Sequence, residues 1–229
     1  DNTGFAKANN QALRITNGAY VLLLNPDTVV TPDAIGKLVE FLDATPGAGG
    51  AGARLLNEDG SLQISAYPEP TLFREFWRMF HLDYSWSYAA YPMKRWGLED
   101  PEKVDILMGA CLLIRKTALD DVGLFDEDYF IYSEEVDLCA RLKHAGWPLY
   151  WVPNAEVTHY GGQSTQQIAE EMFLQLYKAK ILYFRKHRSK IAVIIYKLTL
   201  LFAALGRLAL TPFCYLEKPA QRDNHNHGV

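Results

Sequence analysis

The segment over residues 126–137 has the composition of an acid–base site. It holds six carboxylates in twelve residues, mixed with aromatic side chains that a solvated acidic surface would not carry. Three of these acids, Glu134, Glu135 and Asp137, open a predicted helix, where the helix dipole favours negative charge. A carboxylate beside aromatic walls is a good general base, but Glu134 and Asp137 could equally serve only as helix caps. Arg141 follows Asp137 by one helical turn, which predicts an ion pair.

Asp27 is a candidate ligand for a hard cation. Only Asn25 and Pro26 separate it from the apolar run over 19–24, which is a predicted strand. Open α/β sheets bind ligands at the carboxyl ends of their strands. A carboxylate at this place suits Mg²⁺ or Mn²⁺ beside a diphosphate. The alternative is an Asx turn that only starts the next helix.

His159 stands at the predicted end of a strand and is followed by two glycines, Gly161 and Gly162. Glycines allow the backbone to approach a ligand closely. An imidazole combined with a carboxylate is a suitable donor set for Mn²⁺. A lone histidine can also be structural or idle, and the sequence leaves this alternative open.

The elements that must position these side chains alternate along the chain, which is typical of an α/β sheet. Periodicity predicts helices over 4–16, 31–44, 134–144 and 168–187. It predicts strands over 19–24, 49–56, 61–66, 104–114, 149–152 and 155–158. The first of these strands is apolar throughout, as in a buried parallel strand. Residues 67–103 are aromatic-rich and irregular, and long segments of this kind between regular elements often determine which ligand a protein binds.

Composition excludes several classes of protein. Of the 229 residues, 49% are hydrophobic and 22% are charged, which is ordinary for a globular chain and excludes a mainly disordered, collagen-like or coiled-coil protein. The net charge of −4 gives no electrostatic reason to expect a nucleic-acid partner. Cys111, Cys139 and Cys214 are far apart and odd in number, so neither a disulfide framework nor a structural zinc site is indicated.

The C-terminal part changes character. Basic residues crowd the range 185–190, and an apolar stretch over 191–216 follows, interrupted by Lys197 and Arg207 and expected to bend or end at Pro212. An ordinary spanning helix needs about 20 predominantly apolar residues, which these charges interrupt. The pattern favours a helix lying in the membrane interface with a basic edge toward anionic headgroups.

Two alternatives for this stretch stay open, a helix buried in the protein core and a full membrane span. We therefore predict three parts of the chain. Residues 1–187 form the α/β domain, residues 188–218 form a membrane-associated helical segment, and residues 219–229 form a disordered polar tail.

Taken together, the order and spacing of the motifs resemble the family 2 glycosyltransferases of the rhamnosyltransferase type over residues 1–187. The resemblance rests on NTGFAKANN at 2–10, LLLNPDT at 22–28, MGACLLIRK at 108–116, FDEDYFIYSEEVDLCARL at 125–142 and HYGGQS at 159–164. It implies a GT-A fold, in which a Rossmann-like nucleotide-sugar-binding sheet joins an acceptor-binding half. It also implies inverting transfer of a sugar from a nucleotide-diphosphate donor with a divalent cation, Mg²⁺ or Mn²⁺.

The same resemblance assigns roles to single residues. LNPDT matches the family's metal-binding acidic motif, with Asn25 where many members carry another Asp, so Asp27 and His159 are implied as metal ligands. SEEVD matches the motif whose second acid is the catalytic base, here Glu135. Because this position is Glu rather than Asp, the base could be Glu134, Glu135 or Asp137.

The implied residues for donor or acceptor binding are Asn2, Phe5, Ala8, Asn9, Asn25, Gly109, Ala110 and Asp126. The family usually begins with a strand that carries a Thr-Tyr-Asn-like sequence, followed by further units that hold the nucleobase. No such segment precedes Asp1. We therefore expect the chain to lack the N-terminal part of its nucleotide-binding site.

The function implied is sugar transfer to a glycan or lipid-linked saccharide in cell-surface polysaccharide synthesis. The implied partners are the nucleotide-diphosphate sugar, the saccharide acceptor and a membrane surface, on the cytoplasmic face of the inner or plasma membrane. One alternative is a catalytically inactive GT-A-like module that binds glycans or acts as a scaffold. Another is a nucleotidyltransferase, which usually needs a glycine-rich phosphate loop with a basic residue that the sequence lacks.

Overall fold

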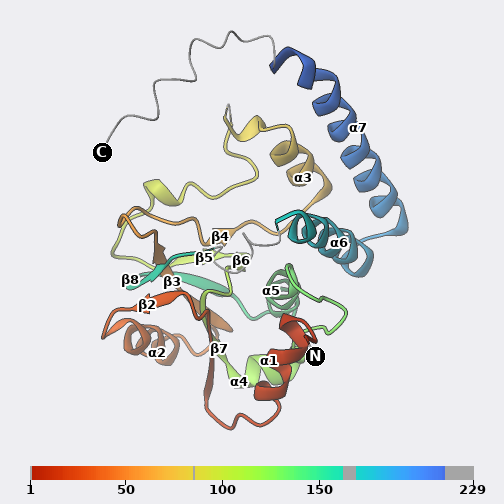
Figure 1. Ribbon diagram of the computed structural model, residues 1–229. Coiled ribbons are helices and arrows are strands. Elements are labelled where there is room, and N and C mark those ends of the chain that lie inside the picture. The colour runs from red at the N-terminus through yellow and green to blue at the C-terminus, as the bar shows by residue number, and fades with distance from the viewer. Residues whose placement is uncertain (1, 85, 162–168, 215–229) are drawn as a thin grey trace.

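A computed structural model describes residues 2–84, 86–161 and 169–214 (Figure 1). In this part of the chain the central sheet has six strands and follows the order β1-β7-β3-β8-β2, with β5 also paired to β8. The strands are β1 (Tyr20–Leu24), β2 (Thr28–Val30), β3 (Gly50–Leu56), β5 (Glu102–Val104), β7 (Cys111–Arg115) and β8 (Leu149–His159). Only β3 and β8 run parallel, and the other pairs are antiparallel. The α/β class expected from the alternating elements is therefore confirmed.

The strand over 19–24 is not parallel as predicted. It is β1, which pairs antiparallel with β7 from Tyr20 opposite Arg115 to Leu24 opposite Cys111. Its run is continuously apolar because both faces are covered: Val21 and Leu23 belong to one hydrophobic core, while Leu22 packs against the other. Burial on both faces, rather than the direction of the strand, explains why the run is apolar without interruption.

Two hydrophobic cores lie on opposite faces of the sheet, because side chains of β7 alternate between them. One core packs against helix α2 (Ala34–Ala44). The other joins the sheet to four helices, namely α1 (Phe5–Leu13), α4 (Lys116–Val122), α5 (Glu134–His144) and α6 (Ala169–His187). The helix predicted over 134–144 is confirmed with the same bounds. The helix predicted over 4–16 is shorter at both ends, and the one predicted over 31–44 begins later but ends at the same residue.

Four predicted strands are corrected by the strand pairing. The two strands predicted over 149–152 and 155–158 form the single strand β8, because pairing with β3 resumes after a bulge. The strand predicted over 104–114 is divided into β5, β6 (Ile106–Leu107) and β7. Of the strand predicted over 61–66, only its last residue belongs to β4 (Ala66–Tyr67), which pairs with β6.

The excursion over 67–103 was expected to be irregular, yet it contains helix α3 (Leu72–Met79). Two short 3-10 helices follow it, η1 (Leu82–Tyr84) and η2 (Met93–Arg95). Thr71 starts α3, since its hydroxyl accepts a hydrogen bond from the Arg74 amide at 3.1 Å.

Helices α6 (Ala169–His187) and α7 (Lys190–Cys214) pack against each other, and α7 runs beside α3 along one flank of the molecule (Figure 1). Helix α7 continues past Pro212, so this proline does not end the helix. In the described residues, one helical stretch, Lys190–Ala209, is long and apolar enough to cross a membrane. The expected segment 188–218 is described as far as Cys214, and the expected tail 219–229 lies outside the described residues.

Helix α7 has one face against the protein and one face exposed. Ala192, Tyr196 and Ala203 are buried, and the Tyr196 ring lies 4.7 Å from that of Phe184 in α6. The exposed side chains form an apolar stripe of Ile191, Ile194, Ile195, Leu198, Leu201, Phe202, Leu205 and Leu208. The helix is thus docked on the domain without being a core helix.

Candidate active site

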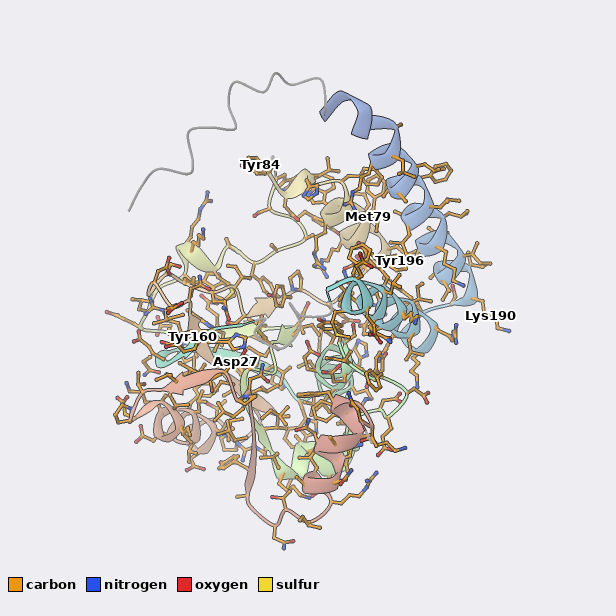
Figure 2. All side chains as sticks on the ribbon, in the orientation of Figure 1. Asp27, Met79, Tyr84, Tyr160, Lys190 and Tyr196 are labelled. Carbon is orange, nitrogen blue, oxygen red and sulfur yellow. The ribbon has the colours of Figure 1, made fainter. Side chains whose placement is uncertain are left out.

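Asp27 and His159 lie together because β2 pairs with β8. Thr28 stands directly opposite His159 in this ladder, and the amide of Tyr160 donates to the Asp27 carbonyl at 3.0 Å. As a result the Nε2 atom of His159 lies 3.3 Å from Oδ1 of Asp27. The side-chain nitrogen Nδ2 of Asn25 lies 3.3 Å from the same Nε2 atom. Two side chains far apart in the sequence therefore form one site (Asp27 is labelled in Figure 2).

Gln63 fixes the orientation of the histidine ring. Its Nε2 donates to Oδ1 of Asn57 at 2.9 Å and to the backbone carbonyl of His159 at 3.1 Å. Its Oε1 must therefore face Nδ1 of His159, 2.7 Å away, so that Nδ1 carries the proton. The lone pair of His159 Nε2 then points toward the Asp27 carboxylate. Nothing in the sequence distinguishes Gln63 from the other polar residues near it.

The two donors fit a divalent cation, because a lone pair and a carboxylate facing each other favour positive charge between them. Nitrogen and carboxylate oxygen are suitable ligands for Mn²⁺, and a hydrogen bond to the second ring nitrogen of a ligating histidine is usual in metal sites. The described residues contain no group of three or more His, Cys, Asp or Glu that could hold a metal. Asp27 and His159 would therefore hold the ion together with ligands from a bound diphosphate and water.

Gln63→Leu is expected to weaken Mn²⁺ binding about 10- to 100-fold, the usual effect of removing a hydrogen-bond partner of a metal ligand. The leucine cannot accept the proton of His159 Nδ1, so the ring loses its orientation. Mn²⁺ titration followed by electron paramagnetic resonance measures the change. Gln63→Glu keeps an acceptor at this place and should retain the affinity. Equal affinity of the Leu variant and the native protein would contradict the role of Gln63.

A cavity of about 380 Å³ adjoins this pair, and we call it the donor cavity for the role that the family resemblance implies. The predicted site residues that line it are Phe5, Asn25, Asp27, Gly109, Ala110, Glu134, Glu135 and His159. Pairing of β1 with β7 continues one residue further, as the Asn25 amide donates to the Ala110 carbonyl at 3.0 Å. This bond places the Asp27 loop beside the Gly109-Ala110 turn. Met108 and Tyr132 also line the cavity and were not predicted from the sequence.

Four predicted binding residues do not line this cavity. Asn2 accepts a hydrogen bond from the Gly4 amide, Asn9 donates to the Phe5 carbonyl, and Ala8 is exposed. Asp126 forms an ion pair with Lys186 of α6. The first three side chains therefore have local or solvent contacts, and Asp126 holds a helix in place.

Asn10 was missed by sequence reasoning although it positions one wall of the site. It is buried, donates to the carbonyl of Phe125 at 2.9 Å and accepts from the Phe125 amide at 3.1 Å. The bond from the Phe5 amide to the Phe130 carbonyl, 2.7 Å, adds a second tie between α1 and this loop. Gly4 is required there, because its φ is 87° and a Cβ would lie 2.5 Å from the Phe130 oxygen.

Glu134 and Glu135 enter the cavity from the first turn of α5. The two preceding residues, Tyr132 and Ser133, have φ angles of 68° and 63°, a left-handed conformation that side chains larger than glycine rarely adopt. Backbone strain of this kind concentrates at functional sites. Here it turns the chain sharply, so that both carboxylates begin the helix at the cavity wall.

The two glutamates carry raised pKa values. Burial, followed by the negative charge of Glu135, raises the pKa of Glu134, and burial raises the pKa of Glu135. Oε2 of Glu134 is buried and has no hydrogen-bond partner among the residues that the structure describes. A carboxylate with a raised pKa is a stronger base than an exposed one, as proton abstraction near neutral pH requires.

Asp137 lies elsewhere. Its side chain is buried, accepts from Nε of Arg141 at 2.8 Å and lies 2.7 Å from Nε2 of His187. The predicted ion pair with Arg141 is thus confirmed. Burial opposes ionisation of Asp137, but the hydrogen bond with His187 and the charge of Arg141 outweigh it and lower its pKa. Asp137 lines neither cavity at the site and joins α5 to the end of α6.

Asp137→Ala is expected to lower the free energy of unfolding by about 3 kcal/mol, because it leaves the partly buried Arg141 without its counter-charge and His187 without its hydrogen-bond partner. The pKa of Asp137 is lower in the folded than in the unfolded protein, so its ionised carboxylate stabilises the fold at any pH above the pKa of the unfolded state. This stabilisation is lost as the pH falls through the pKa of the folded state. The difference from the native protein should therefore shrink in acid. Urea unfolding at neutral and acidic pH measures both effects, with the exposed Asp128→Ala as control. A difference that grows in acid would contradict this account.

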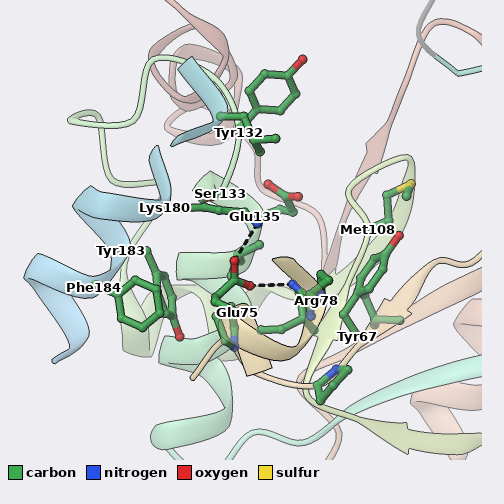
Figure 3. A pocket seen from close by; sticks show the side chains of 16 residues that line it. Tyr67, Glu75, Arg78, Met108, Tyr132, Ser133, Glu135, Lys180, Tyr183 and Phe184 are labelled. Atoms are coloured by element: carbon green, nitrogen blue, oxygen red, sulfur yellow. Dashed lines mark hydrogen bonds and ion pairs between the residues drawn. The ribbon is translucent and has the colours of Figure 1, made fainter. Parts of the chain in front are cut away.

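A second cavity of about 350 Å³ is lined by Glu135 as well (Figure 3), and we call it the acceptor cavity for the role proposed for it below. Met108, Tyr132 and Glu135 line both cavities. Most of the remaining wall is apolar and comes from Tyr67, Pro68, Pro70, Ile106, Leu107, Val136, Leu176, Tyr183 and Phe184.

The polar part of this wall is a cluster centred on Glu75. The buried Glu75 carboxylate pairs with Arg78 at 2.6 Å and with Lys180 of α6 at 2.8 Å (dashed lines in Figure 3). Two cations around one carboxylate give this three-residue cluster a formal charge of +1. The sequence did not predict this cluster, since α3 and α6 are about a hundred residues apart.

The mixed sheet flanked by helices is the GT-A fold that the sequence resemblance predicts. The fold is similar to that of a mannosyltransferase from Pyrobaculum calidifontis solved in complex with GDP-Man and Mn²⁺. The TM-score is 0.52 at 16% identity, over 91% of this chain and 55% of that one. Residues 1–177 match the glycosyltransferase-like family 2, and the chain belongs to that family.

Similar curated proteins include two rhamnosyltransferases. The N-acetylglucosaminyl-diphospho-decaprenol L-rhamnosyltransferase of Mycobacterium tuberculosis is 39% identical over 155 residues, 64% of this chain and 48% of that protein. Rhamnosyltransferase WbbL of Escherichia coli is 25% identical over 192 residues, 81% of this chain and 71% of that protein. The match to the mycobacterial relative thus spans about half of its length.

Proposed function

We propose that the protein transfers a sugar, with inversion, from a nucleotide-diphosphate donor to a saccharide acceptor carried on a lipid, and that Glu135 is the general base. One observation carries this proposal. Glu135 is shared by the donor cavity, which holds Asp27 and His159, and the acceptor cavity behind it. A base at this boundary can reach an acceptor hydroxyl while that hydroxyl faces the donor sugar.

The reaction follows from this arrangement. Glu135 takes the proton of the acceptor hydroxyl as its oxygen forms a bond to the anomeric carbon of the donor. The bond from that carbon to the diphosphate breaks on the opposite side, so configuration is inverted and no covalent intermediate is needed. When bound, a divalent cation at Asp27 and His159 supplies positive charge next to the departing diphosphate.

Glu135 is a better candidate for the base than the other two acids. Glu134 lines the donor cavity alone, where an acceptor hydroxyl would not lie. Asp137 is held by Arg141 and His187 and lines neither cavity. The position of Glu135 therefore supports the assignment that the family resemblance also favours.

The lipid-carried acceptor is supported by two observations. A relative is named for a decaprenol-linked acceptor. Helix α7 exposes an apolar stripe, and the exposed Lys190 and Lys197 lie at its edge, as in a helix that lies on an anionic membrane. We place the protein at the cytoplasmic face of the membrane, with L-rhamnose as the first sugar to test.

A donor screen on the native protein that carries this chain tests the proposal. Nucleotide-diphosphate sugars are incubated with a lipid-linked saccharide, with and without Mn²⁺, and the elongated lipid is detected by mass spectrometry. We expect one donor to be used in the presence of Mn²⁺ and the product to have inverted configuration. Tight acceptor binding without turnover of any donor would instead indicate a glycan-binding module.

A further inference from the structure

Helix α3 is amphipathic with its polar face turned inward. Phe73, Phe76 and Phe80 follow one another at helical spacing and are 54%, 40% and 41% exposed. On the opposite face Glu75 is only 2% exposed and, with Arg78, lines the acceptor cavity. A surface helix of a soluble protein has the reverse orientation, with its apolar face toward the core.

The aromatic character continues beyond the helix. Tyr84 is fully exposed, and Trp86 and Tyr88 are exposed as well. Ring contacts hold these residues to α3, as Phe73 lies 5.2 Å from Tyr88 and Trp77 donates to the Trp86 carbonyl at 2.8 Å. The aromatic surface is defined here as Phe73, Phe76, Phe80, Tyr84, Trp86 and Tyr88. Exposed apolar patches of this kind mark interaction sites.

Helix α3, which carries part of this aromatic surface, lies next to α7, which carries the apolar stripe described above. Helices α3 and α7 pack together, and Arg207 of α7 donates to the Met79 carbonyl at the end of α3 at 3.4 Å. Figure 2 shows Met79 between Tyr84 and Tyr196, at the junction of the two helices. Whatever covers the apolar stripe of α7 therefore also comes close to the aromatic surface, and we call the two together the combined surface.

The chemistry of the combined surface fits a bilayer. Trp and Tyr are enriched where a membrane meets water, because each has an apolar ring and a polar group. Exposed lysines at 190 and 197 lie at the edge of the apolar stripe, where they can meet anionic headgroups. A protein partner would not require this combination of interfacial aromatics, a long aliphatic stripe and flanking cations.

We propose that the aromatic surface inserts into the headgroup region of an anionic bilayer beside α7, so that the protein has two membrane contacts rather than one. This rests on the proposed membrane association of α7. It has a consequence for the acceptor cavity, because the inner face of α3 lines that cavity through Glu75 and Arg78. The cavity then lies one helix away from the lipid, within reach of a saccharide carried on a membrane anchor.

Site-specific labels test the proposal in the intact chain. Cys111 and Cys139 are buried, so an environment-sensitive fluorophore can be attached at Tyr84→Cys in a Cys214→Ser background. Leu201→Cys reports on α7, and the exposed Ile15→Cys, at the far end of α1, is the control. On vesicles of phosphatidylethanolamine and phosphatidylglycerol we expect a blue shift at positions 84 and 201 and none at 15.

Other outcomes overturn the proposal. A shift at position 201 without one at 84 means that α7 alone touches the membrane. A shift at 84 that follows protein concentration without vesicles means that the surface is an interface between copies of the chain. No shift at either position removes the membrane contact altogether, while sugar transfer to a soluble acceptor analogue, measured separately, would leave the proposed chemistry intact.

Vesicle affinity gives an independent measurement. Phe76→Ser together with Phe80→Ser should weaken binding to the same vesicles about 10- to 100-fold, since two partly buried aromatic rings are lost from the lipid contact. Ile15→Ser with Leu98→Ser, exposed apolar residues outside the aromatic surface, should leave binding unchanged. Equal vesicle affinity of the two double variants would exclude the aromatic surface as a membrane contact.

Discussion

Glu135→Gln should lower the rate of sugar transfer about 10²- to 10⁴-fold, the usual loss on removing a general base. The glutamine keeps the size of the side chain at the boundary of the two cavities but cannot accept a proton. Donor binding should stay nearly unchanged, because the Asp27–His159 pair is intact. Single-turnover transfer and donor titration measure the two effects separately.

The matched control is Glu134→Gln, since Glu134 lies in the same turn and lines only the donor cavity. A greater loss of turnover in this variant than in Glu135→Gln would move the base to Glu134. The pH profile adds a second readout. Because the pKa of Glu135 is raised, its basic form is lost as the pH falls through that raised value, and transfer should decline there rather than near the usual range of a glutamate.

Asp27→Asn should lower metal-dependent transfer about 10²- to 10³-fold, the loss typical of removing one group that stabilises developing charge. The change removes the negative charge that faces His159 and preserves the shape of the loop. Unlike Glu135→Gln, it should weaken donor binding in the presence of Mn²⁺, and higher Mn²⁺ should restore part of the activity. Donor titration at several Mn²⁺ concentrations measures this.

Asp33→Asn is the control for Asp27→Asn. Asp33 is an exposed acid a few residues further along and pairs only with Lys37 and Thr31 among the described residues. Its replacement should leave donor binding unchanged. If Asp27→Asn binds the donor with native affinity and native Mn²⁺ dependence, the acid–imidazole pair is not the metal site.

Sequence alone determined the features that depend on near neighbours. The helix over 134–144 follows from its periodicity and from the acids in its first turn, and the structure has the same bounds. The strand ahead of Asp27 follows from an apolar run, because burial selects such runs wherever the strand finally pairs. The motifs also named Asp27, His159 and Glu135, which the structure brings to one cavity.

Only the tertiary structure decided which residues that are distant in the sequence come into contact. Asp137 stands two residues after Glu135, so helix geometry alone turns it about 200° away. Only the tertiary structure places His187 of α6 beside it there. The direction of β1 depends on β7, which is some ninety residues away. The sequence of α3 shows two faces, but a helical pattern alone does not say which face turns inward. The buried pairing of Glu75 with Lys180 decides this, because a charge can be buried only where its partner lies.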